Sequence, residues 1–335
     1  MDVLDWLLAS DPALAWQVER DLAGADETTW RATRARVATE GYGAGLLALQ
    51  DADGQWAGGA YFPKTIVHPV EWGDREAQPW MATAWALKDL REWGVDAAVL
   101  GDTAERIAAN ARWEYDDLPY WGGEVDACIN ASTLATGQWL GADVSGLRAW
   151  FDEHRLSDGG WNCDWVEGAT VSSFHSTLNA LVGLREFSEL GGGDTRESRR
   201  RGEEYLLARR LRLRASTGEP VADWVDRLEY PFRWRYSTLR ALDHFRAASL
   251  LDGTPPDPRL ADAMAVLRAQ RSPDGTWAQG RRDPGAVWFL TDADVGEPSK
   301  WLTFFALRIL QWWDADATVG RAGDARGVAG SGQGK

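Results

Sequence analysis

The sequence predicts an all-α protein in which paired helices surround a central cavity. Three observations support this prediction: a turn ending in tryptophan recurs along the chain, an apolar helical stretch follows each turn, and 21 of 335 residues are tryptophan. Tryptophan buries a large area and is rarely exposed in such numbers. A repeat with a fixed tryptophan position, an aromatic-lined cavity, or both would account for this content.

The recurring turn joins Asp-Gly or Gly-Gly to a tryptophan at 50–56, 157–161 and 270–277, with weaker copies at 120–123 and 230–234. Asp and Gly favour a tight turn. An amphipathic stretch precedes each turn and a more apolar one follows it, which predicts an outer helix that covers an inner helix. The expected outer helices are 29–50, 101–113, 144–155, 195–213 and 258–271, and the expected inner helices are 77–93, 125–141, 171–187, 234–249 and 299–314.

With two N-terminal helices at 3–9 and 12–23, these elements make about five to six helix hairpins. They predict an α/α toroid, a barrel whose inner helices surround an aromatic-lined cavity. An open solenoid of hairpins is the alternative; we expect closure because tryptophan-rich inner helices need burial on both sides. The candidate cavity residues, all on inner helices, are Trp80, Trp139, Trp234, Tyr236 and Trp301.

Composition limits the class of protein. The net charge of −15 and the lack of a basic stripe argue against a nucleic-acid partner. Two cysteines give no disulfide framework, the N-terminus lacks the basic start of a signal peptide, and no apolar run approaches the ~20 residues that span a bilayer. We therefore expect a soluble, cytoplasmic protein with one domain over 1–318 and a disordered Gly/Ala-rich tail over 319–335.

A carboxylate, a thiol and an imidazole lie at the starts of two successive inner helices: Asp126, Cys128 and His175. Within a helix, residues two apart point about 200° away from each other, so Asp126 must lie in or before the first turn if it acts with Cys128. His175 holds the equivalent place in the next repeat. Neighbouring inner helices would bring the three together as zinc ligands and leave a fourth position open, as in catalytic zinc sites.

Cys163, the second cysteine, allows an alternative to this open three-ligand zinc site. As a fourth ligand it would close the site and make the metal structural. We expect it instead to be a core residue, because free cysteine is commonly buried.

The Asp-Gly-x-Trp turns and paired helices, from about residue 36 to 313, resemble the prenyltransferase/squalene-cyclase repeat superfamily. The segment 125–128, Val-Asp-Ala-Cys, resembles the D-x-C metal motif of the protein prenyltransferase β subunits. The segment 174–177, Phe-His-Ser-Thr, with the following Leu-Val-Gly-Leu, resembles their zinc-histidine segment. The resemblance implies that Asp126, Cys128 and His175 bind Zn²⁺, which activates a substrate thiol.

The chain also departs from that family. The Arg and Lys that hold diphosphate, six and three residues before the Asp, are Tyr120 and Gly123 here. The segment 124–127, Glu-Val-Asp-Ala, also resembles the D-x-D-D motif of class II terpene cyclases and keeps only its middle Asp. Such cyclases use two toroidal domains, whereas this chain fits one.

The leading prediction is a zinc enzyme that activates a thiol or water against a small apolar substrate such as an isoprenoid. One alternative is an isoprenoid cyclase with Asp126 as general acid, and another is a non-catalytic binding module with a structural zinc. The family resemblance also raises the option of a partner subunit. The substrate, the oligomeric state and the choice among transfer, cyclisation and hydrolysis are not encoded in any motif of the sequence.

Overall fold

The computed structural model describes residues 2–65 and 78–328, with side chains described as far as residue 315. In this part of the chain the regular secondary structure is helical apart from one two-stranded antiparallel sheet, β1 (Trp277–Ala278) with β2 (Pro298–Ser299). The all-α prediction is therefore confirmed. None of the described helices combines the length and hydrophobicity that crossing a bilayer requires.

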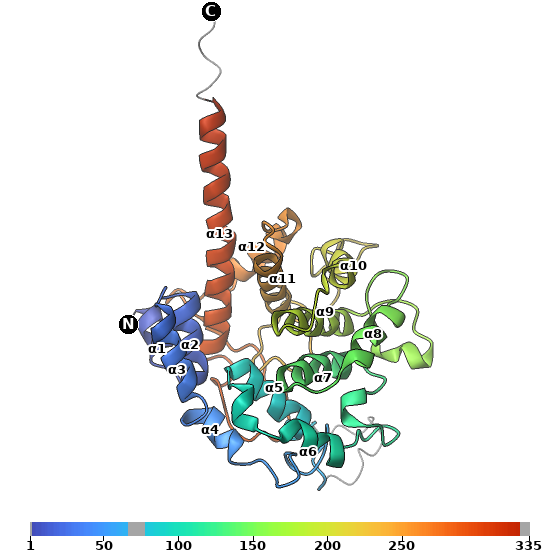
Figure 1. The fold of residues 1–335 in the computed structure, drawn as a ribbon. Helices are drawn as coiled ribbons and strands as arrows, with labels where there is room; N and C mark the ends of the chain where they lie inside the picture. The colour runs from blue at the N-terminus through green and yellow to red at the C-terminus, as the bar shows by residue number, and fades with distance from the viewer. Residues whose placement is uncertain (1, 66–77, 329–335) are drawn as a thin grey trace, which may run out of the picture.

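The helices alternate along the chain as the repeat predicts (Figure 1). The helices that precede the turns are α4 (Gly41–Leu47), α6 (Thr103–Asn110), α8 (Ser145–Glu153), α10 (Arg196–Leu207) and α12 (Ala261–Ala269). Those that follow them are α5 (Thr83–Trp93), α7 (Ala127–Leu140), α9 (Phe174–Glu189), α11 (Thr238–Asp252) and α13 (Lys300–Val328). The N-terminal helices are α1 (Val3–Leu8), α2 (Pro12–Asp21) and α3 (Glu27–Arg36), and the 3₁₀ turns are η1 (Ala97–Leu100), η2 (Tyr120–Gly122), η3 (Cys163–Glu167) and η4 (Pro258–Leu260).

One expected helix is wrong: the stretch 29–50 forms two helices, α3 and α4. The break lies at Gly41, whose φ is +61°. A Cβ there would lie 1.8 Å from a carboxylate oxygen of Asp11, which accepts a hydrogen bond from the Tyr42 N–H at 3.0 Å. The contact with Asp11 therefore needs glycine at this position, where α4 begins after the turn at 37–40 that separates it from α3.

The repeated turn has the same geometry in its three strong copies. Trp56, Trp161 and Trp277 are fully buried. Each indole N–H donates to a backbone carbonyl ten residues earlier, at 2.8, 2.9 and 2.9 Å. Each tryptophan backbone N–H donates to a threonine hydroxyl in the helix that follows, at 3.1, 3.1 and 3.0 Å. The tryptophan thus connects the helix before its turn to the helix after it, which confirms the repeat.

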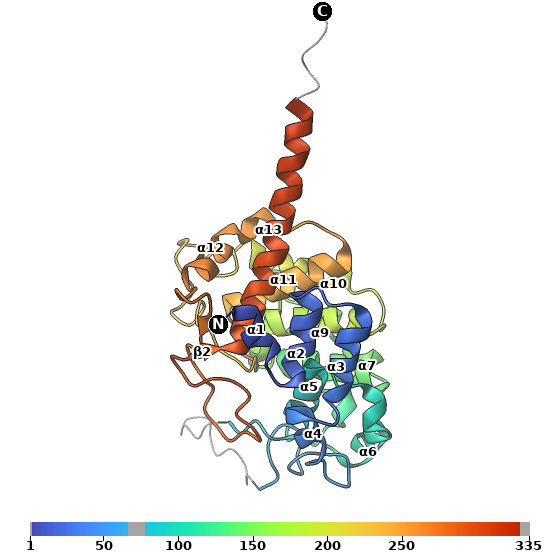
Figure 2. The same cartoon turned by 90° about the vertical axis from the view of Figure 1, so that its left-hand side faces the viewer.

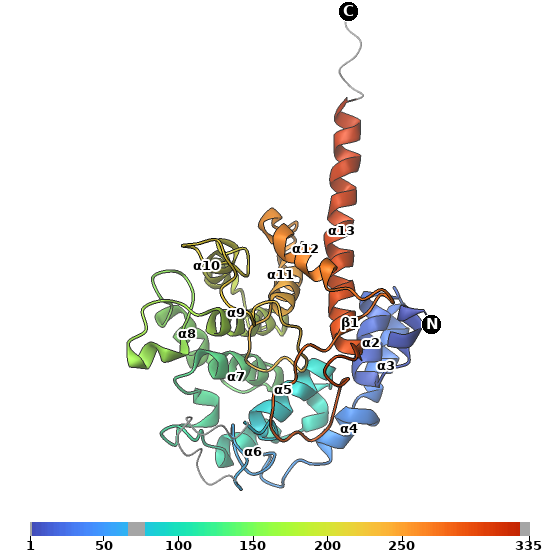
Figure 3. The same ribbon diagram turned by 180° about the vertical axis from the view of Figure 1, so that it is seen from behind.

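The helices that follow the turns pack against one another in sequence order. α5 contacts α7, α7 contacts α9, α9 contacts α11, and α11 contacts α13. α13 then contacts α2, α2 contacts α4, and α4 contacts α5, so the series of contacts returns to its start. Figures 1 and 3 show this arrangement from opposite sides, and Figure 2 shows α13 projecting past the other helices. Because α13 extends to Val328, it enters the segment predicted as a tail.

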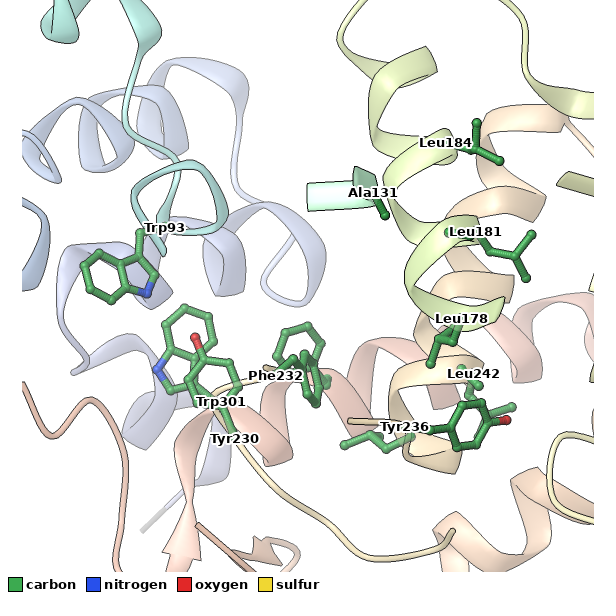
Figure 4. Packing of buried hydrophobic residues seen from close by; sticks show 14 of the residues in the cluster. Trp93, Ala131, Leu178, Leu181, Leu184, Tyr230, Phe232, Tyr236, Leu242 and Trp301 are labelled. Atoms are coloured by element: carbon green, nitrogen blue, oxygen red, sulfur yellow. The ribbon is translucent and has the colours of Figure 1, made fainter. Parts of the chain in front are cut away.

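The closest helix pair, α7 and α9, depends on a small residue. A Cβ at Gly183 would lie 2.4 Å from the carbonyl oxygen of Ala131, so only glycine allows this approach. Figure 4 shows Ala131 of α7 facing α9, with Leu178, Leu181 and Leu184 along α9. The tight contact fixes the starts of α7 and α9, where the predicted metal ligands lie, relative to each other.

Candidate functional site

The loop before α7 positions Asp126 without engaging its carboxylate in a helix cap. Gly123 has φ +74°, and the side chain of Asn130 bonds both the N–H and the C=O of Glu124, at 2.8 and 2.7 Å. Asp126 is the N-cap residue of α7 but makes no side-chain cap hydrogen bond. This matches the prediction that Asp126 lies before the first helical turn. Helix capping therefore does not explain why a carboxylate is found at this position.

The structure pairs the two cysteines. The sulfurs of Cys128 and Cys163 lie 2.9 Å apart, and both cysteines are half-buried and free of disulfides. Cys163 is held in place by Ser176, whose hydroxyl accepts from the Cys163 N–H at 3.0 Å and donates to its sulfur at 3.2 Å. The indole of Trp165 donates to the carbonyl of Val125 at 2.8 Å, which ties η3 to the start of α7. Cys163 is therefore the neighbour of Cys128 rather than an isolated core residue.

Cys128, Asp126 and Glu124 each have a pKa above the usual value of the group. The pKa of the Cys128 thiol is well above its usual value because the thiol bonds to Cys163 and is enclosed. Burial raises the pKa of Asp126, although a hydrogen bond from the Cys163 thiol opposes that shift. Burial and the neighbouring Asp126 raise the pKa of Glu124 to about 7. A metal ion bound here would have to displace thiol protons.

His175 is held in another environment. It is the second residue of α9, its Nδ1 accepts a hydrogen bond from the Tyr236 N–H at 2.8 Å, and its ring lies against Trp224 and Trp234 at 4.5 and 5.5 Å. Burial, and next the charges of Arg235 and Arg240, lower its pKa to about 4, so the ring is neutral at pH 7. Because Nδ1 accepts, the proton of the neutral ring lies on Nε2, which then cannot serve as a metal ligand.

The three predicted ligands are accordingly not assembled in this structure. Within residues 2–65 and 78–315, no group of three or more His, Cys, Asp or Glu side chains is arranged to hold a metal ion. The structure places Asp126 and Cys128 next to Cys163, and it holds His175 against Tyr236 instead. Ligation by His175 would require the hydrogen bond to Tyr236 to break first.

The central space next to Cys128 is narrow and partly charged. One cavity of about 20 Å³ is lined by Cys128, Lys88 and the aromatic residue Trp234, among others. A second of similar volume is lined by Cys128, Asn179 and Arg240. Arg240 donates to Asn179 at 2.8 Å, and Lys88 donates to the carbonyl of Phe232 at 2.7 Å. Buried cations, rather than aromatic rings alone, line the space between the helices.

The five predicted cavity aromatics have different environments. Trp234 lines the cavity beside Cys128, and Trp301 lines another cavity of about 430 Å³. Trp80 and Tyr236 are buried, with their polar atoms donating to backbone carbonyls at 2.9 and 2.5 Å. Trp139 is half-buried against the core.

Sequence reasoning missed the buried cations Lys88 and Arg240. Their helical neighbours are polar as well, with Glu92 four residues after Lys88 and Asp243 three residues after Arg240, so no isolated charge on an apolar face marks these positions in the sequence. The partnership of Cys163 with Cys128 was considered only as an alternative. It was not deducible from spacing, since it depends on how η3 folds back onto α7.

No protein-family model matches the chain, and no curated protein matches it. The roles of Asp126, Cys128 and Cys163 therefore rest on the geometry and chemistry of the chain itself.

Proposed function

We propose that the chain is a zinc-dependent enzyme on an α/α toroid, with Asp126, Cys128 and Cys163 as the metal ligands. The observation that carries the proposal is the meeting of two thiols, from α7 and η3, at 2.9 Å beside an uncapped carboxylate. Two sulfurs and one oxygen are donors that zinc accepts, and three protein ligands leave a fourth position open. The circuit of helix contacts from α5 round to α4 supports closure of the toroid.

The donor types fit zinc, but these three side chains, like every other such group among the described residues, are not yet arranged to hold a metal ion, so the geometry must adjust. Two Zn–S bonds of about 2.3 Å at a tetrahedral angle put the sulfurs about 3.8 Å apart. The thiols are 2.9 Å apart, so they must separate by roughly 1 Å. Cys163 lies in the short turn η3, whereas Cys128 lies in a packed helix, so we expect Cys163 to move.

Metal at this site would supply Lewis acidity that lowers the pKa of a bound thiol or water. Glu124 is placed to receive the proton, because its pKa of about 7 lets it both accept and release protons near neutral pH. Its carboxylate accepts the N–H groups of Val125 and Asp126 at 2.7 and 3.1 Å, which holds it next to the proposed ligands. Glu124 is therefore the proposed general base.

The lining of the neighbouring cavities limits the substrate. Trp85 and Trp234 offer apolar faces, while Lys88 lines both of the cavities that Cys128 also lines. We propose a substrate with an apolar part, such as an isoprenoid, that also carries an anionic group. The cavity beside Cys128 has room for about one water, so side chains must move to admit such a substrate.

A cyclase with Asp126 as general acid is the second candidate. The raised pKa values of Asp126 and Glu124 favour it, since a general acid must hold its proton. Lys88 and Arg240 oppose it, because buried positive charge destabilises a carbocation formed nearby. The zinc enzyme is therefore the better supported function.

Metal analysis of purified protein tests the proposal. We expect about one zinc per chain in the wild type, and loss of that zinc in Cys128→Ala, Cys163→Ala and Asp126→Ala. His175→Ala should retain it, because His175 is engaged by Tyr236. Far-UV circular dichroism before and after chelation is the control. Wild-type protein without zinc would overturn the metal proposal, and unfolding on chelation would make the zinc structural and overturn the enzyme.

A further inference from the structure

One cavity with charged and aromatic walls lies away from the cysteines. It has a volume of about 430 Å³ and is bounded by residues of α2, α5, α9, α11 and α13 and by the loop that carries Tyr230 and Phe232. Figure 4 shows Tyr230, Phe232 and Trp301 grouped beside this space. Tyr230 stacks on Trp301 with ring centroids 4.6 Å apart. One wall of the cavity is therefore a rigid aromatic surface.

The remaining walls are charged, with arginine in excess. Five arginines and four carboxylates line the cavity, in a chain whose overall charge is −15. The carboxylates are already used. Both oxygens of Asp243 accept from Arg308, at 2.8 and 2.6 Å, and both oxygens of Glu189 accept from Arg185, at 2.7 and 2.6 Å.

The two other carboxylates are paired as well. Glu92 accepts from Lys88 at 2.5 Å, and Glu186 accepts from Arg91 at 2.5 Å. None of the four carboxylates that line the cavity forms an ion pair with Arg240.

Two arginines of α11 keep unused hydrogen-bond donors. Arg240, 6% exposed, pairs with no carboxylate in the described part of the chain and donates only to Asn179 and to the carbonyl of Arg235, at 2.8 and 3.0 Å. Arg246 makes one hydrogen bond, from Nε to Asp243 at 3.2 Å, which leaves its two terminal nitrogens unpaired among the described residues. Burial lowers the pKa of both guanidinium groups, with Arg308 adding to the shift at Arg246, and it outweighs the opposing effect of nearby carboxylates, Glu92 and Glu186 at Arg240 and Asp243 at Arg246.

We propose that this cavity binds a small oxyanion, a phosphate or carboxylate group, between Arg240 and Arg246. Guanidinium groups bind such groups with paired, charge-assisted hydrogen bonds, which are strongest where water is excluded. The aromatic wall of Tyr230 and Trp301 would contact the rest of the ligand.

This oxyanion site is separate from the proposed metal site. The passage that Arg240 and Cys128 both line has a volume of about 20 Å³, which is too small for a ligand to reach the thiols. Binding of the oxyanion therefore does not depend on zinc.

Isothermal titration calorimetry with inorganic phosphate and with succinate tests the proposal, in chloride buffer of matched ionic strength. We expect saturable binding of at least one of the two anions, and the comparison between them identifies the preferred group. Arg240→Gln and Arg246→Gln should each weaken binding at least tenfold, since each removes a charged hydrogen-bond donor. Arg201→Gln makes the same charge change on α10, where the side chain is 63% exposed, and should bind like the wild type.

Two outcomes would overturn the oxyanion site. One is that neither anion binds the wild type. The other is that a folded Arg246→Gln variant, with folding checked by circular dichroism, binds as tightly as the wild type. The titrations use chelator-treated protein as well as untreated protein. Equal anion affinity in treated and untreated protein would show that oxyanion binding does not require zinc, so the oxyanion site can be judged separately from the zinc proposal.

Discussion

Replacement of Trp161 by phenylalanine tests the role of tryptophan in the repeat. Trp161 is fully buried, and its indole donates to the carbonyl of Phe151 at 2.9 Å. Phenylalanine keeps an aromatic ring but removes the donor, so the buried carbonyl loses its partner, at a cost of about 1–3 kcal/mol. The smaller ring also leaves roughly 40 Å³ unfilled, which adds about 1 kcal/mol. The free energy of unfolding should therefore fall by about 3 kcal/mol.

Urea denaturation followed by far-UV circular dichroism measures this change. With a urea dependence of about 3 kcal/mol per molar, the midpoint should fall by about 1 M. Trp150→Phe is the matched control, because Trp150 is half-buried and its indole N–H donates no hydrogen bond among the described residues. Its midpoint should change by less than a third as much. Equal shifts in the two variants would refute the claim that the buried indole hydrogen bond stabilises the repeat.

Three further predictions concern ionisation, oxidation and buried charge. The pKa of Glu124 in the folded protein is raised to about 7, so the stabilisation that its protonated form provides is lost as pH rises through 7. The melting temperature of the wild type, relative to that of Glu124→Gln, should therefore fall between pH 5 and pH 8. A constant difference between the two proteins would contradict the raised pKa. Hydrogen peroxide should form a disulfide between Cys128 and Cys163 within one chain, as the two thiols lose two protons and two electrons and the peroxide is reduced to water. Mass spectrometry should show the loss of two hydrogens. Disulfide-linked dimers would be inconsistent with the pairing of these two cysteines. Arg308→Ala should lower the free energy of unfolding by about 3 kcal/mol, because it leaves buried carboxylates without their ion-pair partner. Arg31→Ala removes an exposed ion pair and should cost less than about 1 kcal/mol. Similar chemical-denaturation midpoints for the two variants would argue against the buried network.

The sequence predicted the features that depend on local pattern. The tryptophans at 56, 161 and 277 were identified because their turns repeat, and the structure gives all three the same hydrogen bonds. Asp126 was placed before the first turn of α7 from its spacing to Cys128, and it is the N-cap residue. The all-α class follows from the same periodicity.

The features that failed or went unnoticed depend on contacts between distant segments. At the break between α3 and α4, Asp11 occupies the space beside Gly41. The orientation of His175 is set by the backbone N–H of Tyr236, 61 residues away, and no helical periodicity encodes that contact.

The central claim is that zinc is bound by two sulfurs, from Cys128 and Cys163, together with the Asp126 carboxylate. X-ray absorption spectroscopy of the zinc-loaded protein tests it most directly, because the spectrum distinguishes sulfur, oxygen and imidazole ligands. We predict two Zn–S distances of about 2.3 Å, with oxygen in the remaining positions and no imidazole scattering. One sulfur with a clear imidazole signal would assign the metal to Asp126, Cys128 and His175 instead, and would contradict the role proposed for Cys163.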